Sequence, residues 1–401
     1  MTFRKVLFWM HLSVGCMVGL VIAAMSVTGI LLAYERQITT WADAPAVTLK
    51  DRGTAPLPLD AVIAKLMAAG YGVPDQLTLH HDNRNRADAR YGREKVLFVN
   101  LQTGDVTGES SKRTRAFFAE TEQIHRFLGL GFKSVIGKGL TGLANAAFLF
   151  MLLSGLFLWF PKIWSASSLR SRLLLRRGVT GRAREWNLHN VIGIWALLPL
   201  LLIVITGVVQ SYPQIVGLLY RTPGGSSAPG SFKRQGPPFA QNGRGHRSSG
   251  NNDSDADYGP LNRIAAAAAQ QDLQWKTVTI PVSSNRDRAL VVSVDRSPGG
   301  MPEKVSRLTF DEHTGVLIKT TRFMDSDPAG QLRARARFLH TGEEFGVPGQ
   351  TVAMLASLGA ILLVWSGLSM ALGRLRTPAR VRIKNGIGSE VSVPTEHTRA
   401  G

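Results

Sequence analysis

The sequence predicts an α-helical membrane protein with four transmembrane helices, arranged as two pseudo-repeats, and two periplasmic α+β modules. Three observations predict this fold class: four long uncharged blocks, a one-sided distribution of basic residues, and a repeated order of motifs along the chain. The mean hydropathy of +0.03 conceals the first of them, because long polar stretches alternate with the apolar blocks.

Four blocks are long enough to cross a bilayer, which takes about 20 apolar residues in a helix. They span residues 6–34, 140–160, 188–212 and 346–373. Because four such blocks occur in one chain, buried helices of a soluble protein are a poor explanation for them. We expect the first block to be a retained helix, since its apolar run is too long for a signal peptide.

Basic residues are unevenly distributed between the blocks. The N-terminus, residues 161–186 and the tail after residue 373 carry 15 basic and 3 acidic residues, whereas residues 36–124 carry 12 and 11. Because basic segments remain in the cytoplasm, the sequence predicts a bacterial inner-membrane protein with both termini cytoplasmic and both large segments periplasmic. The formal net charge of +19 then mostly determines how the chain is oriented in the lipid bilayer, which we expect as its partner, and we expect no nucleic-acid partner.

These signals divide the chain into eight regions. The predicted regions are transmembrane helix 1 (1–36), periplasmic module 1 (37–118), a surface segment with transmembrane helix 2 (119–162), a basic cytoplasmic loop (163–186), transmembrane helix 3 (187–213), a periplasmic flexible loop with module 2 (214–335), a surface segment with transmembrane helix 4 (336–373) and a cytoplasmic tail (374–401). Residues 222–257, rich in Gly, Ser, Pro, Asn and Arg, are expected to form the flexible loop.

The two periplasmic modules share one design. Each begins with a helix-like stretch, at residues 59–69 and 261–271, and continues with strand-like runs such as 95–100 and 289–294. Each then reaches a Thr-Gly turn. One helix followed by hairpin strands predicts a small α+β module in each half.

Histidine and small-residue motifs repeat at matched positions and support an internal duplication. In each half a histidine precedes a Thr-Gly pair by 17 residues, and the second helix of each half carries a Ser-Gly-Leu triplet. The matched motifs are His11 with Thr28-Gly29, His189 with Thr206-Gly207, Ser154-Gly155-Leu156 and Ser366-Gly367-Leu368.

Four of the nine histidines lie at or near the ends of the apolar blocks. His11 and His189 are predicted near the cytoplasmic face, and His125 and His340 near the outer face, each of the latter on a short helix or re-entrant turn. Ionisable side chains at membrane depth are costly and tend to be functional. We interpret the other five histidines, His80 among them, as solvated side chains.

The chemistry of the four histidines favours haem. A zinc site prefers four nitrogen or sulfur donors, and each face offers two histidines. The single cysteine, Cys16, excludes a cysteine-ligated iron–sulfur cluster. Haem b needs two axial ligands, for which a neutral imidazole is a common choice, so the pattern favours b-type haem.

Neighbouring residues fit the same interpretation. Gly15, Gly129 and Gly193 each follow a histidine by four residues, where a glycine on the same helical face lets a flat macrocycle approach the backbone. Arg126, next to His125, is a candidate partner for a haem propionate. The second ring nitrogen of each ligand needs a hydrogen-bond acceptor, which the sequence does not identify.

These motifs resemble those of the PepSY-associated transmembrane proteins over about residues 3–375, apart from the predicted flexible loop, and the outer modules resemble PepSY domains. The resemblance is carried by Phe8-Trp9-Met10-His11 through Thr28-Gly29, His125-Arg126 through Trp159, Trp186-Asn187-Leu188-His189-Asn190, His340-Thr341-Gly342 through Ser366-Gly367, and Val99-Asn100-Leu101-Gln102-Thr103-Gly104. Within this group the FoxB-type ferric-siderophore reductases offer a functional analogy.

The resemblance implies an inner-membrane oxidoreductase that reduces the iron of a ferric siderophore on the periplasmic side. It implies an inner haem b on His11 and His189 and an outer haem b on His125 and His340. The sequence contains no GxGxxG after a strand and no Walker motif. Electrons are therefore expected from a quinol or from a cytoplasmic reductase, and the sequence leaves both donors open.

Two other functions remain open at this point. The chain could be a membrane-anchored PepSY protein that binds or regulates an outer protein without redox activity, its histidines being structural. It could also be a transporter, although charged residues are nearly absent from the four apolar blocks.

Overall fold

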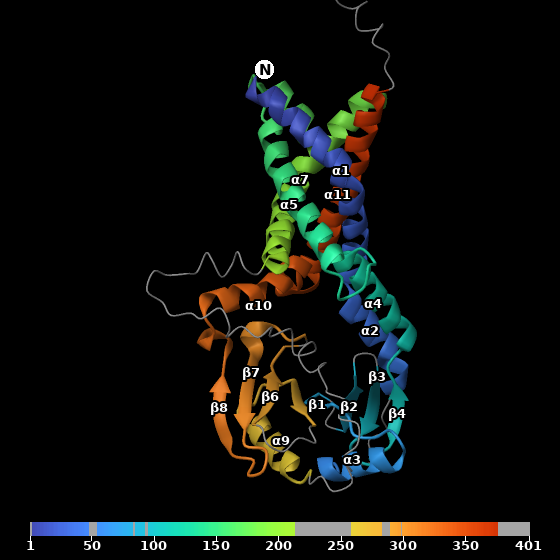
Figure 1. Ribbon diagram of the computed structural model, residues 1–401, viewed down its shortest axis with the longest axis vertical. Helices are drawn as coiled ribbons and strands as arrows, with labels where there is room; N and C mark the ends of the chain where they lie inside the picture. The colour runs from blue at the N-terminus through green and yellow to red at the C-terminus, as the bar shows by residue number, and fades with distance from the viewer. Residues whose placement is uncertain are drawn as a thin grey trace, which may run out of the picture.

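The computed structural model describes residues 2–47, 54–82, 85–92, 95–212, 258–282, 289–297 and 299–375. The predicted flexible loop at 222–257, and all but the first two residues of the predicted tail, lie outside these ranges. Within them, a bundle of long helices is joined to a β-sheet by shorter helices (Figure 1).

Four helices of the described chain are long and apolar enough to cross a membrane, which confirms the four predicted spans. They are α1 (Phe3–Leu32), α5 (Val135–Trp159), α7 (Gly181–Ser211) and α11 (Gly346–Leu375). Both α1 and α7 pack against α5 and against α11. Small and branched apolar side chains fill the centre of this bundle, where Ala360 is buried together with Leu152 and Leu200.

The two predicted α+β modules are joined in a single antiparallel sheet. Its eight described strands have the order β4-β3-β2-β1-β5-β6-β7-β8, so each half of the chain supplies four consecutive strands. In the middle β1 pairs with β5, and Thr78 lies opposite Thr279 with the hydroxyl oxygens 3.1 Å apart. The strands are β1 (Gln76–His80), β2 (Arg86–Tyr91), β3 (Lys95–Asn100), β4 (Val106–Glu109), β5 (Thr277–Pro281), β6 (Leu290–Asp295), β7 (Val305–Phe310) and β8 (Leu317–Thr321).

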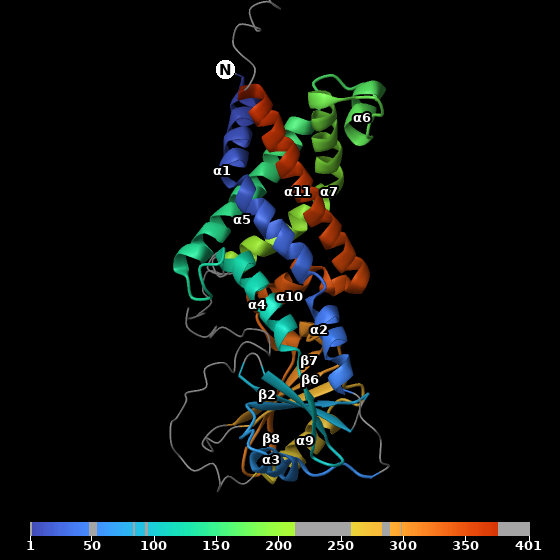
Figure 2. The same cartoon turned by 90° about the vertical axis from the view of Figure 1, so that its right-hand side faces the viewer.

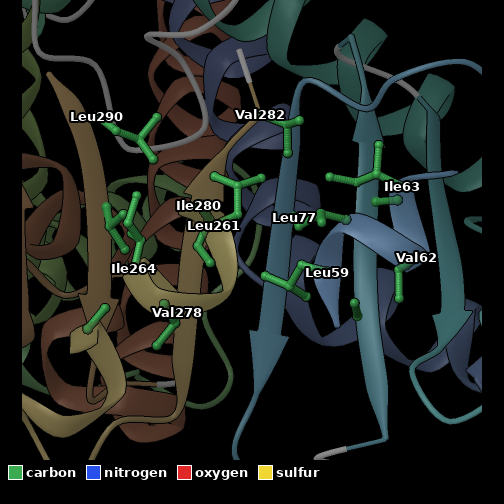
Figure 3. Packing of buried hydrophobic residues seen from close by; sticks show 14 of the residues in the cluster. Leu59, Val62, Ile63, Leu77, Leu261, Ile264, Val278, Ile280, Val282 and Leu290 are labelled. Carbon is green, nitrogen blue, oxygen red and sulfur yellow. The ribbon is translucent and has the colours of Figure 1, made fainter. Parts of the chain in front are cut away.

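One face of the sheet is covered by α3 (Leu59–Ala68) and α9 (Pro260–Gln270), one helix from each half (Figures 2 and 3). Alternate residues of each strand point to one face, and Leu77, Val278 and Ile280 are fully buried beneath these helices. Both halves therefore contribute to one apolar core, and removing this surface from water stabilises their junction.

The opposite face of the sheet looks toward the bundle. Three connector helices lie between the two, namely α2 (Glu35–Asp43), α4 (Lys112–Phe127) and α10 (Pro328–Thr341) (Figures 1 and 2). Arg115 of α4 donates to Asp43 of α2 over 2.7 Å and ties these two connectors together. The remaining short helices are η1 (Ala44–Val47), α6 (Ala166–Leu173), η3 (Pro302–Lys304), η4 (Phe323–Asp325) and η5 (Glu343–Phe345).

Candidate functional site

His125 and His340 meet where the connector helices reach the bundle. His125 lies in the last turn of α4 and His340 in the last turn of α10. Their ring centroids are 6.2 Å apart, with the ring planes at 67°. Metal–imidazole bonds are about 2.0 Å long, so a metal bound between two opposed imidazoles separates their centroids by about 6 Å. A separation of 6.2 Å is compatible with both imidazoles binding one metal ion placed between them.

Left-handed residues end both connector helices shortly after the histidines. Leu128 follows α4 with a φ of 52°, and Gly342 follows α10 with a φ of 76°. A residue in this conformation stops a helix and redirects the chain, here into α5 and, through η5, into α11. A short helix thus holds each outer histidine, as expected.

His11 and His189 lie toward the N-terminal ends of α1 and α7. Nδ1 of His11 is 2.8 Å from Oγ of Ser154 in α5, and Nδ1 of His189 is 2.9 Å from Oγ of Ser366 in α11. The two histidines are also close enough to interact electrostatically. Each one joins the two spanning helices of its own half of the chain.

The outer histidines repeat this pattern with threonines. Nδ1 of His125 is 2.9 Å from Oγ1 of Thr28 in α1. Nδ1 of His340 is 3.3 Å from Oγ1 of Thr206 in α7 and 2.8 Å from the backbone oxygen of Ile203. The candidate acceptors that the sequence left unidentified are therefore four hydroxyls, and the backbone oxygens of Met25, Leu363 and Ile203 also bond His125, His189 and His340.

The hydroxyls determine which ring nitrogen carries the proton. Each hydroxyl also lies within hydrogen-bond distance of a carbonyl about one turn earlier in its helix, and a hydroxyl that donates to this carbonyl accepts from Nδ1–H of the histidine. Nε2 is then left with the lone pair that binds a metal ion. The intrahelical bonds are Ser154 to Met151 (3.3 Å), Thr28 to Ala24 (2.8 Å), Thr206 to Leu202 (2.7 Å) and Ser366 to Leu362 (2.7 Å).

A glycine follows each of these hydroxyl residues, and three of the glycines lie against the rings. An added Cβ on Gly155 would come closer to Cε1 of His11 than an ordinary contact, whereas one on Gly29 or Gly367 would stand in ordinary van der Waals contact with the ring. The Ser-Gly and Thr-Gly pairs mark the duplication in the sequence, and their recurrence at matched positions is the one sequence signal that could have pointed to the acceptors. The distances are 3.3 Å for Gly155 and His11, 3.5 Å for Gly367 and His189, and 3.5 Å for Gly29 and His125.

Two of the predicted cofactor glycines lie where they were expected. Gly15 and Gly193 lie one turn after the inner histidines, in the same helices. An added Cβ on Gly15 would come 3.0 Å from Cε of Met151, and one on Gly193 would come 3.6 Å from Leu363. Both glycines allow close helix packing beside the inner pair, and their contact with a cofactor stays a prediction.

The residues that follow His125 differ from expectation in one respect. Gly129 lies beyond the end of α4 with a φ of 76°, so its expected position on the same helical face as His125 is wrong. Its conformational freedom serves the turn that follows α4. Arg126 pairs with Glu122 over 2.6 Å at an exposed position, and its contact with a propionate stays a prediction.

Burial keeps the outer histidines neutral. Burial, with a smaller contribution from the charge on His340, lowers the pKa of His125 to about 4. Burial also lowers the pKa of His340. Both rings are therefore uncharged at neutral pH, the form in which imidazole binds a metal ion. Within the described residues, no third histidine, cysteine or carboxylate joins a pair to make a metal-binding group of three.

A polar cluster lies on the sheet face that looks toward the connectors. Asp88 lies 3.0 Å from Nε2 of His80 and accepts bonds of 2.6 and 2.9 Å from Arg86. Burial acts to raise the pKa of Asp88, but the contacts with His80 and Arg86 outweigh it and hold that pKa below its ordinary value. His80 is therefore paired with a carboxylate, and the expectation of a solvated side chain is wrong for it.

The chain matches a known protein family over most of its length. The family is described as the PepSY-associated TM region, and the match covers residues 8–374, which include nearly the whole of the four spans and both histidine pairs. No curated protein matches the chain.

Gly137 and Gly139 of α5 provide a matched test of how the end of α4 is held. A Cβ on Gly137 would collide with the backbone of Phe127, whereas one on Gly139 meets nothing within 4 Å. We expect Gly137→Ala to destabilise the protein by about 1–3 kcal/mol through overpacking. Gly139→Ala is expected to be neutral or stabilising by up to about 1 kcal/mol, because alanine favours helix. Thermal unfolding of the purified protein measures both, and equal melting temperatures would contradict the packing described here.

Proposed function

The chain belongs to the PepSY-associated transmembrane family and is a multi-pass membrane protein, and on that premise we propose that it is a di-haem b electron-transfer protein of the bacterial inner membrane. It reduces the iron of ferric siderophores on the side of the sheet, the periplasmic side, and releases Fe(II) for uptake. The observation that carries the proposal is the 6.2 Å spacing of the His125 and His340 rings.

In this proposal His11 and His189 hold the inner haem, and His125 and His340 hold the outer one. Bound haem b supplies a one-electron redox centre. The serine and threonine hydroxyls hold each imidazole as its Nδ1–H tautomer and aim Nε2 away from the acceptor helix. Burial of the outer rings keeps protons from competing with the metal for Nε2.

The side of the sheet suits a water-soluble ferric chelate. The connector helices hold the outer pair between bundle and sheet (Figure 1), and the sheet face toward them carries charged residues such as Arg86 and Asp88. Siderophores hold Fe(III) through hard oxygen donors, for which Fe(II) is a weaker partner, so reduction favours release. Electrons enter at the opposite end, from a quinol or a cytoplasmic reductase.

The visible spectrum tests the cofactors. Dithionite-reduced protein is expected to show the absorption bands of b-type haem, with two haems per chain. His11→Ala and His340→Ala each remove one axial ligand and are expected to lower the ratio to one haem per chain. An unchanged ratio in both variants would refute the ligand assignment. A wild-type protein without haem bands would instead favour a PepSY protein that binds a partner without redox activity.

Ser366 is expected to secure the inner site through His189. Ser366→Ala removes the acceptor of Nδ1–H, and loss of such a partner weakens a metal site by about 10- to 100-fold. Haem loss to excess apo-myoglobin is expected to accelerate accordingly. Ser357→Ala is the matched control in the same helix, because the Ser357 hydroxyl bonds the Ala353 carbonyl. Equal haem loss in the two variants would mean that His189 does not depend on Ser366.

Single-turnover oxidation tests the substrate and its side. Protein reduced with dithionite and freed of reductant is mixed with a ferric siderophore, and haem oxidation is followed in the visible range. We expect His340→Ala to block electron transfer to iron while the inner haem still becomes reduced. His313→Ala changes an exposed histidine in the turn between β7 and β8 and is expected to keep the wild-type rate. A wild-type rate in His340→Ala would place the reaction elsewhere.

A further inference from the structure

The predicted basic loop between α5 and α7 contains a helix, α6 (Ala166–Leu173), at the end of the bundle far from the sheet (Figure 2). The buried side chain of Asn187 in α7 donates to the carbonyls of Ser171 and Leu174 over 2.7 and 3.2 Å. It also accepts from the backbone of Arg176 over 2.9 Å. This segment, residues 162–177, is therefore held against the bundle, and we call it the α6 platform.

Large apolar side chains of the α6 platform are exposed. They flank α6 on both sides and lie close to the ends of two membrane spans, since α5 ends at Trp159 and α7 begins at Gly181. Side chains of this kind beside span ends enter the boundary between headgroups and acyl chains. The exposed fractions are 79% for Ile163, 64% for Trp164, 52% for Leu174 and 62% for Leu175.

Exposed basic side chains lie among these apolar residues. Lys162, Arg170, Arg176 and Arg177 are exposed, and none of them forms an ion pair with a carboxylate of the described residues. Arg172 differs, because it donates to the carbonyl of Trp159 over 2.5 Å. The platform therefore presents unpaired positive charge and apolar surface side by side.

We infer that the α6 platform binds anionic phospholipids, its basic side chains meeting the phosphate headgroups and its apolar side chains the adjoining acyl chains. Charge complementarity selects an anionic ligand, and the exposed apolar residues select a lipid over a free anion. An acidic soluble protein would match the charges but would leave the apolar side chains at the span ends without lipid. The inference requires the membrane spans and is independent of the proposed haems.

Titration of phosphatidylglycerol into the full-length protein in detergent, followed by native mass spectrometry, tests the inference. Basic residues near an anionic surface each strengthen binding by about fivefold. The triple variant Arg170→Gln, Arg176→Gln, Arg177→Gln is therefore expected to lower phosphatidylglycerol affinity on the order of a hundredfold and to leave phosphatidylcholine affinity unchanged. The control triple Arg113→Gln, Arg263→Gln, Lys319→Gln removes the same charge from the sheet side and is expected to bind as the wild type.

Three outcomes would overturn the inference. Unchanged phosphatidylglycerol affinity in the platform variant would remove its basis. Displacement of the lipid by inorganic phosphate at equal concentration would make the platform an anion site without lipid specificity. Loss of binding to an acidic soluble protein in the platform variant, with its phosphatidylglycerol affinity unchanged, would make the platform a protein-docking surface. Binding to the wild type must also weaken as salt is raised, a result that requires no variant.

Discussion

A polar ring nitrogen inside an apolar bundle must find its partner within the protein, and this constraint links the helices around the four histidines. The bond from His11 to Ser154 joins α1 with α5, and the bond from His189 to Ser366 joins α7 with α11. The bond from His125 to Thr28 fastens a connector helix to α1. The hydrogen bonds that orient each histidine ring thus also join the helix that carries the histidine to a neighbouring helix.

The duplication makes each histidine pair a joint product of the two halves. Each pair takes one member from the first half and one from the second, just as the sheet takes β1 from one half and β5 from the other. The two halves of the sheet meet at the Thr78–Thr279 pair, and the two halves of the outer site meet at the rings of His125 and His340. Each half supplies one histidine of the outer pair, so the pair requires both halves.

The sequence was sufficient for features that arise from local pattern. Four apolar blocks gave the four spans, and the run at 95–100 coincides with β3. The pairing of β1 with β5 could not be predicted from the sequence, because it depends on the register between two segments about 200 residues apart. The acceptor hydroxyls were missed because a serine or threonine in an apolar helix can equally well be a small residue that allows two helices to pack closely. Gly129 was misplaced because the end of α4 is set by Leu128, a residue without a turn signature.

The two histidine pairs occupy different kinds of element, a difference that the proposed reduction of a water-soluble chelate would explain. His11 and His189 belong to spanning helices, where lipid surrounds the bundle and a water-soluble molecule does not enter. His125 and His340 belong to connector helices outside the four spans, although their Nδ1 acceptors belong to α1 and α7. An outer histidine is thus anchored in the membrane domain while its own helix faces the sheet. In the proposed function, a chelate too polar for the hydrocarbon would approach only such a position, and for this reason the proposal puts the iron substrate at the outer pair rather than inside the spans.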